Sequence, residues 1–417
     1  MEYYNIVDNR YRDACIAQIL LPCVRLEFVD NYGRTYSDFT VDVSSENGGT
    51  ISATFGQGVQ KSISLTIFDP NGKYIPNPNN RRFWIGRRFK VYLGLRIPTN
   101  PEDIYDISKG NKTVGQVDDY DIYWFTKGTY ILTAISASHE LANQTISISG
   151  VDKFGFFTSA TGYCEMLGDF VIREGMTIQD ALIAILHQDV GNGEIIDAVT
   201  PIIDSTYYNV RIPYDISKSA GTYMGDIMTE LATMYRANIY YDNDGHLNFR
   251  RSMIGDEAAP IPIVWDFTDK DAEYLSSTLD YDIVNVGNRL YVVGDNPTAK
   301  RAPIAFKENT NAASPTNVQR IGRKARLITV STIKTTQEAE DYAVYMLNQL
   351  ARVQQSLNFN ITLLPHLELN QKVTITDNFY HKEKEEFLIQ SINFPIGLGT
   401  MSLGAVKVEE LPTYENG

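Results

Sequence analysis

The sequence predicts an α+β protein that is mostly β, with two antiparallel β-rich portions on either side of a smaller α/β unit. Three observations support this class. Apolar and polar residues alternate along most of residues 24–150, helical spacing begins after Gly150, and strand patterns return from about residue 263. The chain of 417 residues is therefore divided into 1–150 with an N-terminal extension, 151–262, and 263–417.

In the first portion, segments of alternating polarity are separated by turn-forming residues. VRLEFVD places Val24, Leu26 and Phe28 on one side of a strand, and NYGR follows as a turn. TISATF and SISLTIF repeat the alternation, with the glycine-containing bend FGQGVQ between them. The segments YWF, YILTAIS and QTISISG bring the expected total before residue 151 to roughly five to seven strands. Residues 98–121 are expected to form a long acidic loop.

A basic cluster precedes one of these strands. In RRFWIGRRFKVYLGL, residues 81–95, the pattern from Arg88 onward alternates apolar with basic or aromatic residues, which predicts a half-buried strand with a basic outer face. Charges at the rim of a sheet are usually solvated. The alternative is a contact with an acidic neighbouring subunit, anchored by the tryptophan. The candidates for that subunit interface are Arg81, Arg82, Trp84, Arg87 and Arg88.

Helices are expected in the middle and last portions. Thr177 with Asp180 begins a helix in TIQDALIAILHQD, and TYMGDIMTELATMYRA followed by the hairpin NIYYDNDGHLNFR completes the middle unit. A polar loop at 295–323 precedes a capping box at Thr335 and Glu338. The helix that follows, at about 335–355, is expected to pack outside the terminal strands. Its apolar stripe consists of Ala339, Tyr342, Met346, Leu350 and Val353.

The charge balance limits the partners. With 37 basic and 51 acidic residues the formal charge is −14, so the averaged field repels nucleic acid and anionic lipid. We expect no sequence-specific nucleic-acid binding, whereas passive contact with DNA stays possible. Cys15, Cys23 and Cys164 form no CxxC pair and are interpreted as reduced, buried thiols. The polar N-terminus predicts neither a signal peptide nor a membrane anchor.

Catalytic and cofactor motifs are not recognisable. GxSxG, HExxH, a P-loop and a Cys/His constellation do not occur, and five histidines are scattered without metal-ligand spacing. The DNDG at 242–245 lacks the first and twelfth carboxylates of a calcium loop, so a tight turn is the better interpretation. We therefore expect no enzymatic activity, no metal and no bound cofactor.

Three segments in order carry a family resemblance. SASHELANQTISISGVDKFG, then YDISKSAGTYMGDIMTELATMYRANIYYDNDGHLNFR, then EAEDYAVYMLNQLARVQQSLNFNITLLPHLELNQKVTITD resemble the hub proteins of tailed-phage baseplates and related contractile injection particles. The resemblance covers residues from about 24 to 410. It implies two tail-tube-like β-barrels joined through smaller domains, and three copies forming a ring that adapts the sixfold tail tube to a threefold central spike or tail tip.

The resemblance also implies a location and partners. The protein would belong to the virion tail, assembled in the host cytoplasm, and would contact the hexameric tail tube or a distal tail protein, a central spike or tail-tip protein, and neighbouring baseplate proteins. Genomic DNA would pass through its channel without specific binding. Two other functions stay open. A receptor- or glycan-binding tail protein would use its aromatic residues as stacking platforms, and a cell-wall hydrolase would need a catalytic cleft.

Overall fold

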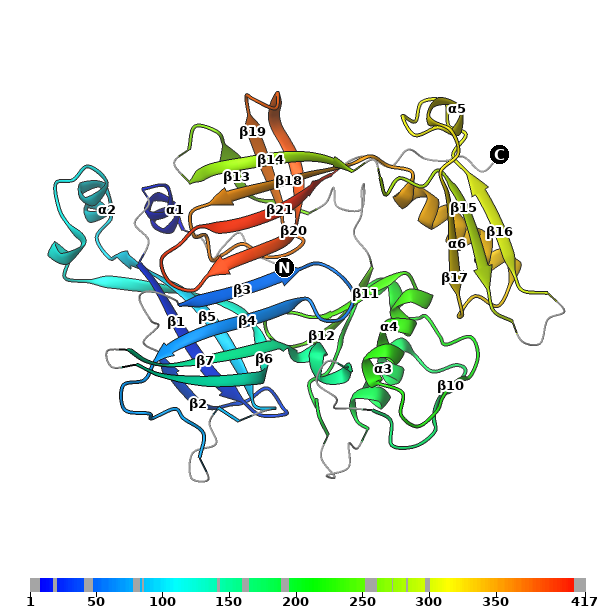
Figure 1. Ribbon diagram of the computed structural model, residues 1–417, viewed down its shortest axis with the longest axis horizontal. Helices are drawn as coiled ribbons and strands as arrows, with labels where there is room; N and C mark the ends of the chain where they lie inside the picture. The colour runs from blue at the N-terminus through cyan, green and yellow to red at the C-terminus, as the bar shows by residue number, and fades with distance from the viewer. Residues whose placement is uncertain are drawn as a thin grey trace.

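The computed structural model describes most of the chain and has an elongated outline (Figure 1). A large sheet occupies one end, a compact α/β unit lies beside it, and a second, smaller α/β unit forms the other end. The described residues are 8–17, 21–40, 48–77, 83–84, 86–140, 143–159, 165–188, 195–251, 261–271, 273–282, 284–296 and 301–408.

Strand pairing joins both β-rich portions into one 13-stranded sheet. The first portion supplies β1 (Leu21–Val29), β2 (Thr35–Thr40), β3 (Gly49–Thr54), β4 (Lys61–Phe68), β5 (Arg88–Pro98), β6 (Tyr120–Glu140) and β7 (Asn143–Asp152). The last portion supplies β13 (Ile263–Thr268), β14 (Tyr274–Asp282), β18 (Gln354–Ile361), β19 (Lys372–Asp377), β20 (Lys382–Pro395) and β21 (Met401–Lys407). The predicted class, α+β with mostly strand, is confirmed.

The long strand β20 is the junction between the two portions. The order of the sheet is β14-β18-β21-β20-β3-β4-β7-β6-β5-β1-β2, with β19 beside β20 and β13 beside β19. The first part of β20 pairs with β19, and its last part pairs antiparallel with β3, from Ser391 opposite Thr54 to Pro395 opposite Thr50. Among the described strands the ladder runs from β14 to β2 without returning on itself.

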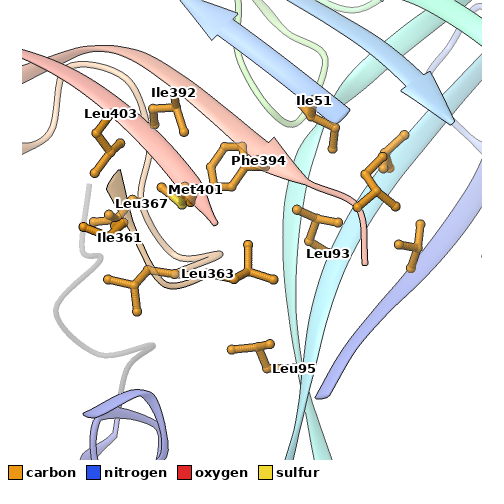
Figure 2. Packing of buried hydrophobic residues seen from close by; sticks show 14 of the residues in the cluster. Ile51, Leu93, Leu95, Ile361, Leu363, Leu367, Ile392, Phe394, Met401 and Leu403 are labelled. Carbon is orange, nitrogen blue, oxygen red and sulfur yellow. The ribbon is translucent and has the colours of Figure 1, made fainter. Parts of the chain in front are cut away.

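The two portions also share one hydrophobic core. Alternation along β3 and β5 turns Ile51 and Leu93 inward, where they belong to the same cluster as Phe394, Met401 and Leu403 from β20 and β21 (Figure 2). All five side chains are at most 3% exposed. Burial of this kind is the main favourable term in folding, so the portions are expected to stabilise each other.

The N-terminal helix α1 (Asn9–Ile16) adds a second link between them. Asp8 accepts the backbone N–H of Tyr11 as an N-cap, and the fully buried Tyr11 hydroxyl is hydrogen bonded to His366 Nδ1 at 3.1 Å. Burial, together with the nearby Lys127 ammonium, lowers the pKa of His366 to about 3. The imidazole is therefore neutral at physiological pH and serves as part of the core.

The middle unit has a core of its own. It contains η3 (Lys153–Phe157), β8 (Phe170–Ile172), α3 (Ile178–Leu186), β9 (Ile202–Ile203), η4 (Ser205–Tyr207), β10 (Ile216–Lys218), α4 (Met224–Met234), β11 (Ala237–Tyr241) and β12 (Leu247–Arg251). The predicted N-cap is present, since Thr177 accepts the N–H of Asp180. The turn between β11 and β12 is closed by Asp242 N–H donating to His246 O at 3.0 Å, as the hairpin interpretation of DNDG requires.

The predicted helix of the last portion packs elsewhere than expected. Helix α6 (Thr336–Leu350) begins at the predicted capping box. It lies on β15 (Arg289–Gly294) and β16 (Ile304–Glu308), not on the terminal strands of the large sheet. With β17 (Ala325–Val330) and the short α5 (Val318–Ile321), these elements form the small unit at one end of the molecule. The reason is that Ala339, Ala343 and Leu347 form a narrow stripe that lets the helix approach this sheet closely.

The two segments expected to be loops contain regular structure. Residues 98–121 include α2 (Pro101–Ser108), capped by Asn100, and the turn η2 (Val114–Gln116). Residues 295–323 include β16 and α5. The division of the chain at residues 150 and 262 stays a prediction.

We predict that the shared core makes the two β-rich portions lose stability together. Phe394→Ala should lower the free energy of unfolding by about 3–5 kcal/mol because it removes a buried ring from the cluster. Hydrogen-deuterium exchange should then rise in β3 to β5 as well as in β18 to β21. Phe379→Ala is the matched control, since Phe379 is 82% exposed. Faster exchange in the terminal strands alone would contradict a shared core.

Candidate assembly surfaces

The outer face of the large sheet is almost free of charge across the central part of eight neighbouring strands. Most outward positions there carry serine, threonine, asparagine or small residues, and Asp280 is the charged side chain in the set given below. Glu140, Asp282 and Glu386 lie on the same side of the sheet outside this central part. We call this set the uncharged face. It consists of Ser276, Thr278, Asp280, Ser356, Asn358, Asn360, Ser402, Gly404, Ser391, Asn393, Thr50, Ser52, Thr54, Ser62, Ser64, Thr66, Thr145, Ser147, Ser149, Ala134, Ser136 and Ser138.

Register places these side chains in rows across the junction of the two portions. Residues directly opposite each other in adjacent strands point to the same side of a sheet. One row runs Ser276, Asn360, Ser402, Asn393, Ser52, Ser62. Within it, the Asn360 amide donates to Ser276 Oγ at 2.9 Å, and the Ser52 hydroxyl donates to Asn393 Oδ1 at 3.0 Å. The polar groups of the face therefore form some of their hydrogen bonds with one another.

Charges return where the same sheet reaches β5 and β1. Arg25 and Glu27 lie on the outward side of β1 and form an ion pair at 2.7 Å. Lys90 and Arg96 occupy outward positions on β5. The neutrality of the uncharged face is therefore local, and it does not follow from a general lack of charge in the strands.

Sequence reasoning missed this face although a signal was present. In TISATF, SISLTIF and QTISISG the polar member of each alternating pair is serine or threonine, without lysine or glutamate. Exposed protein surface normally carries about 25–35% charged residues. Hydroxyls and amides can exchange hydrogen bonds with a passing molecule, but they offer neither cations to hold phosphate nor anions to repel it.

The structure separates the five candidate residues of the basic cluster. Arg81 and Arg82 lie outside the described residues. Trp84 and Arg87 are exposed at the start of β5, as an interface role requires. Arg88 differs from the prediction: its side chain is 8% exposed and contacts other residues of the same chain.

Arg88 joins the large sheet to the middle unit. Its Nη2 donates to the carbonyl oxygen of Ile196 at 2.6 Å, and its Nη1 donates to Asn31 Oδ1. The guanidinium also lies over the ring of Phe156, 5.2 Å from the centroid. The alternation in the sequence correctly placed Arg88 on the outer face of β5, but at this position the middle unit covers that face.

Buried charges lie on both sides of the same contact. Lys153 Nζ lies 2.7 Å from Asp197 Oδ2, and the Tyr241 hydroxyl donates to that oxygen at 2.7 Å. Burial lowers the pKa of Lys153, opposed by the Asp197 carboxylate. Burial also raises the pKa of Asp152 to about 6, although this carboxylate accepts backbone N–H groups from Gln60. Both partners of the Lys153–Asp197 pair belong to the middle unit, so removing one of them would leave a buried charge unpaired inside that unit, next to its contact with the large sheet.

The cavity at this contact is lined by groups that are already paired. It measures about 270 Å³, and its cations Arg88, Lys90 and Lys153 each have a partner, with Lys90 Nζ 3.0 Å from Asp244 Oδ1. Within the described ranges, no three His, Cys, Asp or Glu residues gather as metal ligands would. None of the helices in those ranges is long and apolar enough to cross a membrane.

We predict that Arg88 and its neighbour Arg87 differ sharply in their contribution to stability. Arg88→Ala should lower the free energy of unfolding by about 2–4 kcal/mol, since it leaves buried acceptors without their donor. Arg87→Ala should change it by less than about 0.5 kcal/mol because that side chain is exposed. Urea unfolding of both variants measures the difference. Equal, small effects would show that Arg88 does not hold the middle unit.

Comparison with solved structures identifies the fold. The tail protein from Neisseria meningitidis MC58 superposes with a TM-score of 0.60 at 13% identity, covering 93% of this chain and 96% of that one. The 43 kDa tail protein of prophage MuSo2 from Shewanella oneidensis gives 0.59 at 12% identity, covering 93% and 98%. A chain of the lidded Francisella PdpA-VgrG complex gives 0.52 at 9% identity, covering 95% of this chain and 54% of that one.

These likenesses show a shared fold at low sequence identity. No family model matches the sequence, and no curated protein matches it. The resemblance predicted from three sequence segments is thus confirmed as a resemblance of fold: the chain has the architecture found in a Neisseria tail protein, in a prophage tail protein and in a chain of a PdpA-VgrG complex.

Proposed function

We propose that this protein is a structural hub of a phage tail or baseplate, in which three copies close a ring between a sixfold tail tube and a threefold spike or tail tip. The observation that carries the proposal is the pairing of β20 with β3. It places two β-rich portions of one chain side by side in one sheet, as two neighbouring subunits of a tube would be placed. Three such chains supply six portions around an axis while keeping threefold symmetry.

In this ring the uncharged face lines the channel. The face spans the β20–β3 junction, so it is continuous between the two portions of each chain. Genomic DNA carries one phosphate charge about every 1.7 Å of helix axis, and lysine or arginine on the wall would hold it. A wall of hydroxyls and amides lets the DNA pass without specific binding. The formal charge of −14 disfavours adhesion of DNA to the protein surface on average.

The ring implies the remaining partners. One end would meet the hexameric tail tube or a distal tail protein, and the other a central spike or tail-tip protein, with other baseplate proteins around it. Trp84 and Arg87, exposed beside the start of β5, are proposed contacts to a neighbouring subunit or to the next ring. The protein would act in the virion tail after assembly in the host cytoplasm, and it would have no catalytic role.

We predict that lysines introduced on the uncharged face bind DNA only when the DNA passes through the hole of the ring. Native mass spectrometry first establishes rings of three. In preassembled rings, Ser52→Lys, Ser64→Lys and Ser136→Lys together should bind linear duplex DNA in a salt-dependent manner, because the new cations line the hole. A closed circle of the same sequence cannot enter a closed ring and should not bind. Wild-type rings should bind neither form.

The control places three lysines outside the large sheet, at the exposed residues Gln179, Thr206 and Ser217 of the middle unit. Any DNA binding by this variant should be equal for linear and circular forms. Equal binding of both forms by the first variant would place the uncharged face outside the ring. Loss of the ring in that variant would make the face a subunit contact, and a wild-type monomer would refute the hub.

A further inference from the structure

Two segments of opposite charge remain unused by the proposed ring. Residues 98–121, here called the acidic arm, contain six carboxylates and two lysines. Residues 284–334, here called the basic unit, contain nine lysines or arginines and two carboxylates, in a chain whose overall charge is negative. Each segment is built on its own secondary structure, α2 in the arm and the sheet β16-β15-β17 in the basic unit.

The basic unit leaves one face of its sheet uncovered. Leu290 and Val292 turn toward α6, so Arg289 and Tyr291 lie on the opposite side of β15. Register aligns Phe306 and Leu327 with Tyr291 in one row across that side. Leu327 is 70% exposed and Phe306 43%, which is unusual for large apolar side chains that lie next to each other.

Cations surround this apolar row. The Arg289 guanidinium lies over Tyr291 and over Phe306, 5.6 and 4.8 Å from the ring centroids. Glu308 is the carboxylate nearest to it, 3.6 Å away, and the same carboxylate lies 3.9 Å from Arg323. Arg323 is 69% exposed and Arg320 on α5 is also exposed. One carboxylate thus lies near two arginines, and the face is suited to an acidic partner that also offers apolar groups.

The acidic arm has this composition. Lys112 pairs with Asp103 at 2.5 Å and lies 3.9 Å from Asp106, and Asp121 pairs with Arg10 at 2.7 Å. The other three carboxylates, Glu102, Asp118 and Asp119, are exposed, and the two aspartates lie at the base of the arm. Large apolar side chains are exposed beside these charges, and Tyr105 on α2 is 57% exposed.

The arm and the basic unit lie at opposite ends of the longest axis of the molecule (Figure 1). Helix α2 projects at one end of the large sheet, and β15 to β17 with α6 form the other end. The two surfaces of one chain therefore cannot meet, and a contact between them would join two copies.

We propose that the uncovered face of the basic unit docks on the acidic arm of the next copy. The inference rests on the proposed trimeric ring and names the surfaces that close it. A contact between two different surfaces is heterologous, so it repeats from copy to copy and closes after three steps when each step turns by a third of a circle. Leu327, Tyr291 and Phe306 supply the apolar centre of the contact, and Arg320 and Arg323 meet Asp118 and Asp119 at its rim.

A charge swap tests whether the two surfaces touch each other. Arg320→Glu with Arg323→Glu should weaken assembly by about 100-fold through like-charge contacts, and so should Asp118→Lys with Asp119→Lys. Combining all four substitutions in one chain should restore assembly to within about tenfold of wild type, because the pairs are re-formed with opposite sign. Sedimentation and native mass spectrometry at several concentrations give the association constants.

Two further variants separate assembly from folding. Leu327→Ser should weaken assembly while leaving the unfolding of the monomer unchanged, since this side chain is exposed within one chain. Arg173→Glu is the matched control, because Arg173 on the middle unit is 70% exposed, as Arg323 is 69% exposed. It should leave the ring intact.

The outcomes distinguish failure of the proposed docking from failure of the proposed hub function. Rings that persist in both reversed variants, or a four-residue swap that fails to restore the ring, would overturn the proposed docking while the wild-type trimer stands. Short duplex DNA that binds the wild type and is lost in Arg320→Glu with Arg323→Glu, with assembly unchanged, would assign the basic unit to nucleic acid instead. A wild-type chain that never forms a trimer would refute the hub before the variants are compared.

Discussion

The backbone pairing of β20 with β3 is the constraint on which the rest of the structure depends. Five residue pairs there convert two β-rich portions into one sheet, although the two paired strands lie more than half of the chain apart in sequence. Because β20 also pairs with β19 and β21, its side chains belong to the core that Ile51 and Leu93 enter from the first portion. The same junction makes the uncharged face continuous, so folding and the proposed channel wall depend on one ladder.

Charge is distributed over the molecule according to what each surface contacts. Inside the chain, Arg88 joins the large sheet to the middle unit and the Lys153–Asp197 pair lies within that unit, where burial makes every donor and acceptor costly to leave unpaired. On the uncharged face, paired hydroxyls and amides replace ions. At the two ends of the long axis, the acidic arm and the basic unit carry opposite excess charge, which suits contacts between copies and not within one.

Local sequence patterns predicted the helices and strands well, but they did not predict which elements pack or pair with each other when they lie far apart in the sequence. Alternation around Phe89 and Val91 identified β5, and the capping box at Thr335 and Glu338 identified the start of α6. The partner of α6 was misjudged because an apolar stripe shows which side of a helix is buried but not which sheet covers it. For the same reason Arg88 was assigned to an exposed surface, since sequence places it on the outer side of β5 without revealing that the middle unit covers that side.

The most direct measurement of the central claim is electron microscopy of the assembled particle at a resolution that traces strands. We expect three chains around the hole, each contributing two portions joined at β20 and β3, with Ser52 and Asn393 facing the lumen. A particle with another copy number, or with these two residues on its outer wall, would contradict this claim.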